Sequence, residues 1–274
     1  MKTYIATVHF RRSDWIDRQL ASIHAYAPEA EVWASLDHIE PEHFAKFTRA
    51  WSLDLEPLGP GIEPYASSSD DPGGDGHGLK LNELARRICE VAQDDDTLLF
   101  LDGDALLLQP LANVLAQTEA LAAVRRNEND GDEFPHPSYC LTTVGRWKQL
   151  QGDWRRGVFV TSATGREMTD TGTKLTSQLA AMQWSWLPLI RINATNLHPV
   201  WFGIYGTPTL GPVVYHHGAG FRTRVSRADL ALKKKKKWFQ RHSFEDSQAA
   251  LDQEVLRWID SDSQNWWRAT LMKQ

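Results

Sequence analysis

The sequence has little cysteine, no long apolar segment and no excess of positive charge. Its two cysteines, Cys89 and Cys140, supply neither a disulfide framework nor a metal-binding cysteine pattern, which fits a reducing compartment. No apolar run approaches the roughly 18 residues that a membrane-spanning helix needs. Residues 1–10 are too short and too mixed in character for a secretory signal. We therefore expect a protein that is made and kept in the cytoplasm.

The charge balance narrows the class of partner. The chain has 30 basic and 35 acidic residues, and its formal net charge of -5 argues against a protein built around nucleic-acid binding. Its 274 residues can form one large domain or two small ones. The 12 tryptophans are unusual. Tryptophan often stacks on sugars and flat rings, but core and interface packing is its more common role.

Apolar strands alternate with helical segments in the N-terminal half. Residues 4–8, 31–36 and the almost wholly apolar 97–101 have the character of buried strands. Apolar residues at helical spacing follow a cap at Ser13 or Asp14, in an element that Pro28 closes, and they recur over 79–92. This order predicts a doubly wound α/β fold with a mixed, mostly parallel sheet flanked by helices. Ligands of such a sheet bind at the carboxyl ends of the strands.

The rest of the chain is less regular. Residues 67–78 are a polar, glycine-rich loop, and a loop rich in Asn, Asp and Pro follows a short strand at 122–124. We expect a helix over 172–182 and short strands near 189–192 and 213–215. The segment from residue 228 is predicted to be a mostly helical tail, whose tryptophans pack on the main domain.

Two carboxylates at the end of the central strand are the strongest chemical signal. Asp102 and Asp104 follow the apolar run directly, separated by Gly103, which permits a tight bend. Carboxylates at the mouth of a buried strand are costly unless they are paired or bind a metal. Mg²⁺ and Mn²⁺ prefer oxygen ligands and often take carboxylates together with substrate phosphates. The alternative is a strand-end turn that uses Asp for its turn chemistry.

This Asp-Gly-Asp segment resembles the Asp-x-Asp motif of the GT-A glycosyltransferases. Residues 78–86 and 98–104 are similar to the helix and strand that precede the motif in family 2 transferases. The resemblance covers roughly residues 1–222 and implies a Mn²⁺- or Mg²⁺-dependent transfer of a sugar from a nucleotide donor, with UDP favoured. It implies a GT-A domain over 1–227, with a nucleotide-binding half, 1–110, and an acceptor half, 111–227. Residues 228–274 would form a basic, Trp-rich helical extension.

The resemblance also assigns donor-binding positions. The expected contacts with the base, ribose or diphosphate come from the ends of the first two strands, the helix before the motif and the motif itself: Thr7, His9, Arg11, Asp37, Lys80, Asn82, Asp102 and Gly103. Structural alternatives remain open for three of them. Asp37 can be a turn residue, Arg11 a solvated surface charge and Lys80 an exposed helix lysine.

The catalytic base of an inverting enzyme would be a carboxylate that deprotonates the acceptor hydroxyl. Asp170 opens a predicted helix that precedes a strand, which is similar to the family 2 pattern, and it is the first candidate. Helix capping is its alternative role. Asp153 is the rival candidate for the base. A retaining enzyme would need no dedicated base, and the paired acidic residues usual in family 2 are absent.

A late His-His-Gly segment is the second landmark. It resembles the His-containing, Gly-rich segment of families such as family 8, in which the His completes the metal site. Since neighbouring residues of an extended segment face opposite ways, one histidine alone should reach the metal, and His217 is preferred. The remaining candidate substrate contacts are Trp201, His216, Gly218 and Arg222. Local hydrogen bonding in a glycine turn is the alternative role of both histidines.

The implied partners are a nucleotide-sugar and a glycan or lipid-linked acceptor of bacterial surface-polysaccharide synthesis. Lys233–Lys237 would allow peripheral contact with the inner face of a membrane, although most such runs are solvated. Two other functions compete with the transferase. One is a haloacid-dehalogenase-like phosphatase, because residues 100–104 resemble the strand that carries the nucleophile of that family. The other is a non-catalytic protein that binds nucleotide-sugars.

Overall fold

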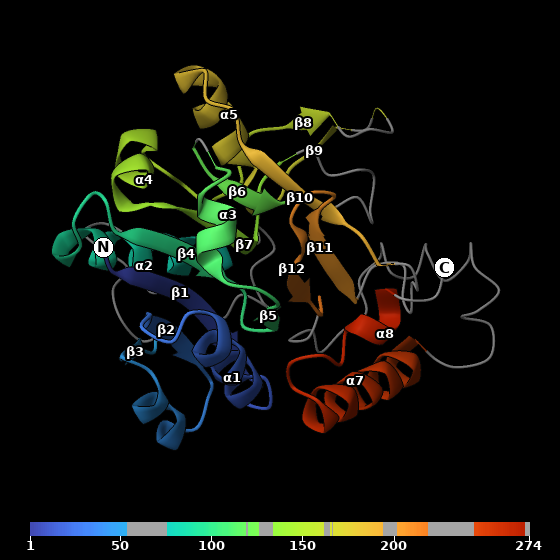
Figure 1. Cartoon of the computed structure of the whole chain (residues 1–274). Coiled ribbons are helices and arrows are strands. Elements are labelled where there is room, and N and C mark those ends of the chain that lie inside the picture. The colour runs from blue at the N-terminus through green and yellow to red at the C-terminus, as the bar shows by residue number, and fades with distance from the viewer. Residues whose placement is uncertain are drawn as a thin grey trace.

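A ten-stranded mixed sheet organises the protein (Figure 1). The structure, a computed structural model, describes residues 1–53, 76–118, 120–125, 134–161, 165, 167–193, 202–218 and 244–271. The sheet strands are β1 (Thr3–Phe10), β2 (Glu31–Asp37), β3 (Arg49–Trp51), β4 (Thr97–Leu101), β5 (Ala105–Leu107), β6 (Ala122–Val124), β7 (His136–Thr143), β10 (Leu187–Arg191), β11 (Gly203–Thr207) and β12 (Gly211–His216). Their spatial order is β3-β2-β1-β4-β7-β6-β10-β11-β12-β5.

Helices flank this sheet, and a small two-stranded sheet lies apart from it. The helices are α1 (Ile16–Tyr26), the 3-10 helix η1 (Pro41–Lys46), α2 (Gly76–Val91), α3 (Leu111–Leu115), α4 (Val144–Leu150), α5 (Thr173–Met182), α7 (Phe244–Ser261) and α8 (Arg268–Leu271). The small sheet pairs β8 (Val160–Thr161) with β9 (Glu167–Met168). The predicted architecture, a mixed sheet with flanking helices, is confirmed.

Parallel pairing prevails in the N-terminal half of the sheet. β3, β2, β1 and β4 are parallel neighbours, and β1 pairs with both β2 and β4. The carboxyl ends of these strands therefore lie at one edge of the sheet, where β4 delivers the Asp-Gly-Asp segment. Pairing is mostly antiparallel beyond β4, with a parallel β6–β10 pair between the antiparallel strands.

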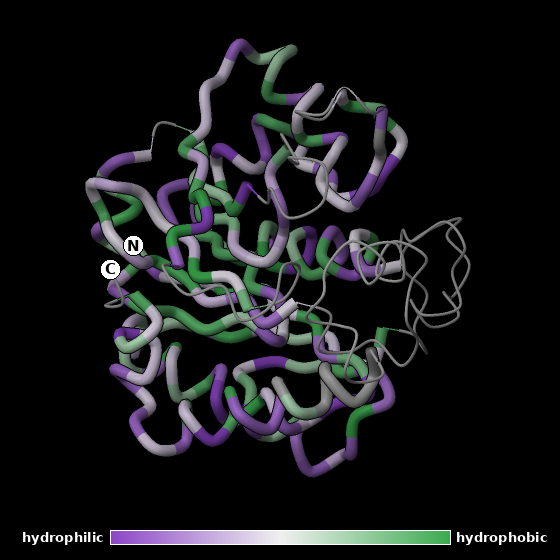
Figure 2. The backbone as a smooth tube through the Cα atoms, turned by 90° about the vertical axis from the view of Figure 1, so that its right-hand side faces the viewer, coloured by the Kyte–Doolittle hydropathy of each residue, from purple (hydrophilic) through white to green (hydrophobic). Residues whose placement is uncertain are grey.

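Alternate residues of the central strands point into different hydrophobic cores. Leu98 and Phe100 of β4 pack in the cluster that contains the buried residues of α2, whereas Leu99 and Leu101 pack in the cluster that contains those of α1. Since side chains alternate along a strand, a strand covered on both faces must be apolar at every position. That requirement explains the continuous apolar run of β4. The hydropathy colouring shows green strands in the middle of the molecule (Figure 2).

The sequence did not predict a central strand, β7, that follows the Asn-, Asp- and Pro-rich loop expected after residue 124. β7 lies between β4 and β6 and is antiparallel to both. Its sequence, HPSYCLTT, carries polar residues and a proline, yet almost all of its residues are buried. Several polar groups of β7 are hydrogen-bonded, as where the Thr142 hydroxyl donates to the carbonyl of Ala120 at 2.8 Å. Internal hydrogen bonding of this kind is what allows polar side chains into a core.

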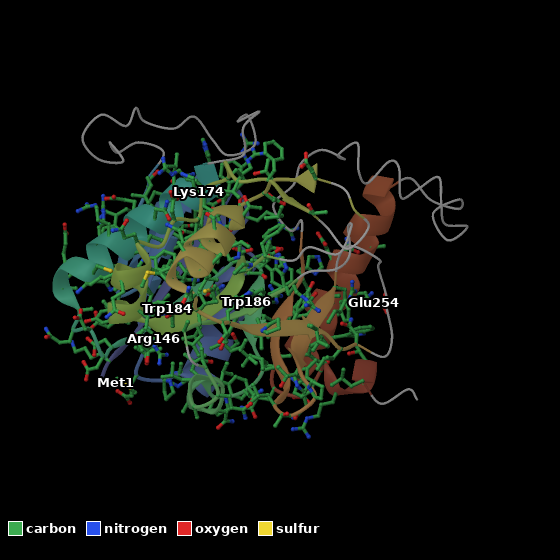
Figure 3. The ribbon with its side chains drawn as sticks, turned by 90° about the horizontal axis from the view of Figure 1, so that it is seen from above. Met1, Arg146, Lys174, Trp184, Trp186 and Glu254 are labelled. Carbon is green, nitrogen blue, oxygen red and sulfur yellow. The ribbon has the colours of Figure 1, made fainter. Side chains whose placement is uncertain are left out.

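The C-terminal helices pack on the far strands of the sheet. Val255 and Ile259 of α7, with Trp266 and Trp267 beyond it, form a third core with residues of β5, β11 and β12. The expected packing of the tail on the main domain is thus confirmed. Figure 3 shows α7, marked by Glu254, at the end of the molecule opposite α4 and α5. The predicted boundary at residue 227 and the run Lys233–Lys237 lie outside the described residues.

Several tryptophans serve the core rather than a surface. Trp15, Trp33 and Trp154 are fully buried, and Trp147 stacks on Trp154 with ring centroids 5.7 Å apart. The packing role therefore holds for these residues. No helix within the described residues is both long enough and apolar enough to cross a bilayer.

Candidate metal centre

Three side chains that could hold a metal ion converge beyond the carboxyl end of β4. Asp102, Asp104 and His216 each offer a ligand atom, and these atoms lie within 4.8 Å of one another. The His216 Nε2 is 3.5 Å from Asp102 Oδ2 and 3.4 Å from Asp104 Oδ1. The three residues are buried, and the exposed fraction of Asp104 is 2%. Antiparallel pairing of β12 with β5, which sets His216 opposite Ala105, brings the imidazole to the carboxylates.

Gly103 is required by the packing of the turn between the two carboxylates. A Cβ atom at this position would lie 2.6 Å from the carbonyl oxygen of Val8 and 2.7 Å from His9 Nδ1. Both distances are shorter than any real Cβ contact, so no other residue fits without a shift of the backbone. The turn is closed by the N–H of Ala105, which donates to the carbonyl of Asp102 at 2.9 Å. The glycine thus lets the loop lie flat against the end of β1.

The donor set fits a divalent cation. Two carboxylates and an imidazole are ligands that Mn²⁺ accepts, and Mg²⁺ shares the preference for the oxygens. The Oδ1 atom of Asp102 is buried and makes no hydrogen bond among the described residues. The Nε2 of His77, at the start of α2, lies 3.1 Å from this oxygen. Two clustered buried carboxylates are costly without a positive charge between them, and a cation would remove that cost.

Gln19 of α1 connects this loop to β1, and sequence reasoning did not identify it. Its Nε2 donates to the carbonyl oxygens of Asp102 at 2.6 Å and Ala105 at 3.2 Å. Its Oε1 accepts from the Thr7 hydroxyl at 3.1 Å and lies 3.0 Å from the Nε2 of His9. Gln19 is fully buried. A lone glutamine on a helix has no recognisable sequence pattern, so only the fold could reveal its role.

Thr7 and His9 of β1 support the Asp102–Asp104 loop through their contacts with Gln19. Both side chains are fully buried against Gln19, so the predicted direct contact with a nucleotide does not agree with their positions. Because the Oε1 of Gln19 can only accept, the Nε2 of His9 carries the hydrogen. Burial lowers the pKa of His9 to about 4, which keeps the ring neutral at physiological pH. Thr7 and His9 therefore support the loop through Gln19, and they do not contact the donor as the sequence predicted.

Asp37 and Lys80 form a buried ion pair instead of two separate ligand contacts. The Lys80 Nζ lies 2.9 Å from Asp37 Oδ2, and both side chains are almost completely buried. Ser35 donates to the same carboxylate at 2.5 Å, and the Lys80 ammonium lies over the Phe10 ring, 5.7 Å from its centroid. The pair joins α2 to the end of β2. Neither side chain is exposed for the base, ribose or diphosphate contact expected from the sequence.

Arg11 is exposed at the edge of the sheet, just after β1. It has a positive φ of 60°, and its N–H donates to the carbonyl of Asp37 at 3.0 Å. The guanidinium lies over the Phe10 ring, 4.7 Å from its centroid. Among the predicted donor contacts at the ends of β1 and β2, Arg11 alone is exposed.

His217 does not face the carboxylates, so the choice between the two histidines is corrected to His216. The Nε2 of His217 lies 2.6 Å from Asp252 Oδ1, and its Nδ1 lies 2.7 Å from the Tyr215 hydroxyl. Both ring nitrogens are thus engaged, one with Tyr215 of β12 and the other with Asp252 of α7. The backbone N–H of His217 donates to the carbonyl of Asp104 at 3.1 Å. The expectation that only one of the two adjacent histidines reaches the site agrees with this geometry.

His136, at the start of β7, extends the site and was missed with its strand. Its ring centroid is 5.7 Å from that of His216. The Nδ1 of His136 accepts from the backbone N–H of Ser138 at 3.1 Å, which places the ring hydrogen on Nε2. The polar sequence of β7 had concealed both the strand and this residue.

Asp153 is held by three neighbours and does not have the character of a base. Its carboxylate accepts from Asn82 at 2.7 Å, from the Arg155 guanidinium at 2.8 Å and from Lys174 at 3.1 Å. Burial raises the pKa of Asp153, but the hydrogen bonds from Arg155, Asn82 and Lys174 outweigh it and lower the pKa well below the usual range. Asn82 also accepts from the N–H of Trp154 at 2.9 Å. Both predicted site residues therefore fix the turn between α4 and β8.

Asp170 lies in the segment that leads into α5. Its Oδ1 accepts from the N–H of Thr171 at 2.8 Å, and no side-chain hydrogen bond caps the helix. The next glycine, Gly172, packs so closely on Pro135 that a Cβ would lie 2.2 Å from the Pro135 carbonyl oxygen. Pro135 precedes His136, so the chain around Asp170 borders the histidine side of the site. The roles of base and of local turn residue both remain compatible with this position.

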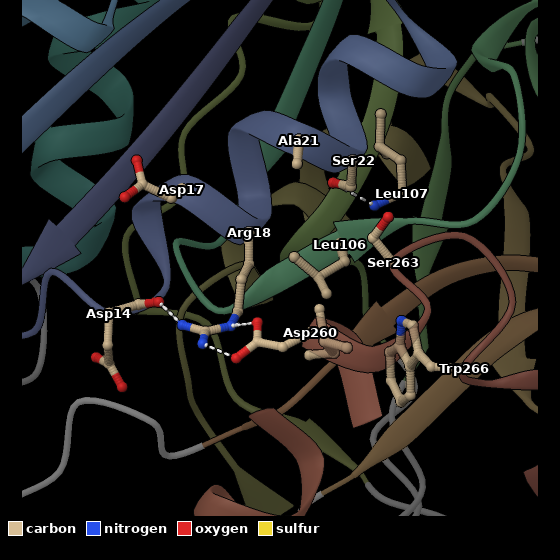
Figure 4. Close-up of a pocket in the computed structure, with 11 residues that line it drawn as sticks. Asp14, Asp17, Arg18, Ala21, Ser22, Leu106, Leu107, Asp260, Ser263 and Trp266 are labelled. Carbon is tan, nitrogen blue, oxygen red and sulfur yellow. Dashed lines mark hydrogen bonds and ion pairs between the residues drawn. The ribbon is translucent and has the colours of Figure 1, made fainter. Parts of the chain in front are cut away.

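The other predicted positions add little. Gly218 is buried directly after His217 with a positive φ of 74°, a conformation that favours glycine. Trp201 and Arg222 lie outside the described residues. A pocket of about 440 Å³ lies between α1 and α7, but neither Asp102 nor Asp104 lines it (Figure 4).

Comparison with known proteins finds similarity in structure but not in sequence. No protein-family model matches the chain, and no curated protein matches its sequence. The chain is similar to the apo form of the glycosyltransferase GlyE of Streptococcus pneumoniae, with 14% identity and a TM-score of 0.38 over 69% of this chain and 45% of that chain. It is similar to the catalytic domain of Drosophila beta1,4galactosyltransferase 7 in complex with xylobiose, with 10% identity and a TM-score of 0.40 over 86% and 82%.

A third similar structure is S. aureus TarS in complex with UDP-GlcNAc, with 12% identity and a TM-score of 0.36 over 71% of this chain and 60% of that chain. The chain spans less than half the length of GlyE. GlyE is a glycosyltransferase, and the Drosophila protein is a galactosyltransferase.

Proposed function

We propose that this protein is a metal-dependent glycosyltransferase that uses a nucleotide-diphosphate sugar as donor. The observation that supports the proposal most is the buried group of Asp102, Asp104 and His216 at the carboxyl end of a central strand. That edge is where α/β sheets bind ligands. The three side chains would hold Mn²⁺ or Mg²⁺ between the protein and the donor diphosphate.

A divalent cation held at this site would supply positive charge to the diphosphate as negative charge develops on the leaving group. The protein's own residues prepare the site. Gln19 and Gly103 fix the backbone of the loop against β1, and the imidazole of His216 would add a nitrogen ligand. His77, 3.1 Å from Asp102 Oδ1, orients that carboxylate. A preorganised loop of this kind stabilises charge without reorganisation during the reaction.

The acceptor hydroxyl needs a base only if the transfer inverts the anomeric centre. Asp170 is our candidate for this base, because its segment borders His136, whereas the carboxylate of Asp153 is held by Arg155 and Lys174. A retaining transfer would leave Asp170 as a turn residue. The anomeric configuration of the product, measured by NMR, separates the two outcomes.

The substrates follow from the same proposal. We favour a UDP-sugar as donor and a glycan or lipid-linked acceptor of bacterial surface-polysaccharide synthesis, with the reaction in the cytoplasm. Contact with the inner face of the membrane through Lys233–Lys237 stays a prediction from the sequence, because these residues lie outside the described part of the chain.

A thermal-shift screen of UDP, GDP, CDP and dTDP, each with and without Mn²⁺, tests the proposal. A ligand that binds only the native state raises its melting temperature by mass action. We expect one nucleotide to raise the melting temperature, and to do so only when Mn²⁺ is present. The shift should disappear in Asp104→Asn. The exposed Asp95 offers a matched control, since Asp95→Asn should keep the full shift. The absence of a shift with every nucleotide and Mn²⁺ would exclude the proposed site.

A further inference from the structure

The C-terminal helix α7 reaches the candidate metal centre through one histidine. The ring of His217 is completely buried and lies between the Tyr215 hydroxyl at 2.7 Å and Asp252 Oδ1 at 2.6 Å. Because the Asp252 carboxylate accepts, the Nε2–H of His217 donates to it. The Trp15 ring packs on the imidazole at a centroid distance of 4.8 Å. The orientation of His217 is therefore determined on all sides.

The orientation of His217 in turn determines two parts of the site. Because adjacent side chains of a strand face opposite ways, a His217 ring fixed toward α7 sets His216 toward the carboxylates. The backbone N–H of His217 donates to the carbonyl of Asp104 at 3.1 Å, and its carbonyl accepts from Phe202 at 2.8 Å. A change in the position of His217 would move His216 and Asp104 together.

Asp252 is itself held in place from the N-terminal half of the chain. The Arg12 guanidinium donates to Asp252 Oδ2 at 2.7 Å, and the side chain of Asp252 is 13% exposed. Burial raises the pKa of Asp252, but the hydrogen bonds from His217 and Arg12 lower it overall, so the carboxylate is charged. A second pair also holds α7, because Arg18 of α1 binds Asp260 of α7 through two hydrogen bonds (Figure 4).

We propose that Asp252 is a positioning residue of the metal centre. Acting through His217, it holds His216 and Asp104 at the separation that a divalent cation requires, and α7 is thereby part of the functional unit. This inference rests on the proposed function, because it presupposes a cation at Asp102, Asp104 and His216. Partners of this kind, which orient a metal site without touching the metal, typically change metal affinity by about 10–100-fold.

The test is the affinity of the full-length protein for Mn²⁺ alone, measured by electron paramagnetic resonance of the free ion. We expect Asp252→Ala to weaken binding by about tenfold. Asp252→Asn keeps an acceptor for His217 but loses the charge that pairs with Arg12, and it should bind Mn²⁺ nearly as well as the wild type. Asp260→Ala is the matched control, since it removes another contact of α7 that has no link to β12.

The outcomes separate the inference from the proposed function. Equal Mn²⁺ affinity of the wild type and Asp252→Ala would overturn the positioning role and leave the metal centre intact. Equal weakening in Asp252→Ala, Asp252→Asn and Asp260→Ala would also overturn it, because a general loosening of α7 would then explain the result. A wild type that binds no Mn²⁺ would overturn both proposals. Melting temperatures of the variants, recorded without metal, show that each protein is folded.

Discussion

The ammonium of Lys80 lies 2.9 Å from the carboxylate of Asp37, and water reaches neither group. The pair joins α2 to the end of β2, which is the neighbour of β1 in the sheet. The candidate metal centre lies beyond the end of β4, on the other side of β1. Removing one member leaves an uncompensated charge in the core, which costs more than the loss of the attraction itself.

We therefore expect Asp37→Asn or Lys80→Met alone to lower the free energy of unfolding by about 3–5 kcal/mol. The double variant, which leaves no unpaired charge, should recover a large part of this loss. Urea unfolding followed by circular dichroism measures all three. Single variants that lose less than about 1 kcal/mol would show that the pair is not the buried interaction described here.

The two adjacent histidines should differ in how their mutation changes the stability of the metal-free protein. His216→Ala removes a ligand of the proposed cation and should weaken Mn²⁺ binding strongly, with little change in melting temperature without metal. His217→Ala leaves Tyr215 and Asp252 without their buried partner, and each such loss costs about 1–3 kcal/mol. Calorimetric melts and Mn²⁺ titration distinguish the two, with the exposed His24→Ala as the control. Mn²⁺ affinity that survives His216→Ala would remove this residue from the site.

Gln19→Glu tests the connection between α1 and the Asp-Gly-Asp loop with a nearly isosteric change. The carboxylate cannot donate to the carbonyls of Asp102 and Ala105, so two hydrogen bonds become repulsive contacts. We expect a lower melting temperature and weaker Mn²⁺ binding than in the wild type. Gln93→Glu, at an exposed position after α2, controls for the added charge. Unchanged Mn²⁺ affinity in Gln19→Glu would show that the loop holds its position without this residue.

His9 predicts a pH dependence of stability in the metal-free protein. Burial lowers its pKa in the folded state to about 4 from the usual value of 6.5, so between these values the unfolded chain binds a proton that the folded chain does not. The stabilisation is present above about pH 6.5 and is lost as the pH falls toward 4, by about 3 kcal/mol in all.

Urea unfolding in EDTA at several pH values between 7 and about 4 measures this effect. His9→Asn keeps a donor for Gln19 but does not titrate, and its stability should fall less steeply over the same range. Parallel pH profiles for the two proteins would contradict the assignment of this dependence to His9.

The two candidate bases can be separated by kinetics once a donor and acceptor are known. In an inverting enzyme, Asp170→Asn should lower kcat by about 10²–10⁴-fold with little change in stability. Asp153→Asn should act through stability, because it weakens the contacts with Asn82, Arg155 and Lys174. A kcat lost in Asp153→Asn at unchanged melting temperature would reverse the two assignments.

The sequence predicted the elements that depend on local pattern. β1, β2, β4, α2 and α5 were recognisable because their apolar residues follow the period of a covered strand or an amphipathic helix. β7 was not, because its polar residues obtain their partners from distant parts of the chain: Thr142, for example, bonds to Ala120, 22 residues away. No local pattern contains that information.

The same limit applies to the candidate site. Asp102 and Asp104 were identified because they end a covered strand, which is a local property. The choice between His216 and His217 depends on the pairing of β12 with β5 and on Asp252, neither of which the sequence indicates. Gln19 and His77 are single polar residues on helices, and they gain their roles only when α1 and α2 are placed beside the loop.

The contact between Arg12 and Asp252 joins residues that are 240 positions apart, and Arg18 and Asp260 are 242 apart. During synthesis on the ribosome, β1, α1 and β4 emerge long before α7 exists. Contacts of such long sequence separation form late and slow the folding of a chain. The third core, which α7 closes, must therefore stay exposed to water or to chaperones until almost the whole chain has been made.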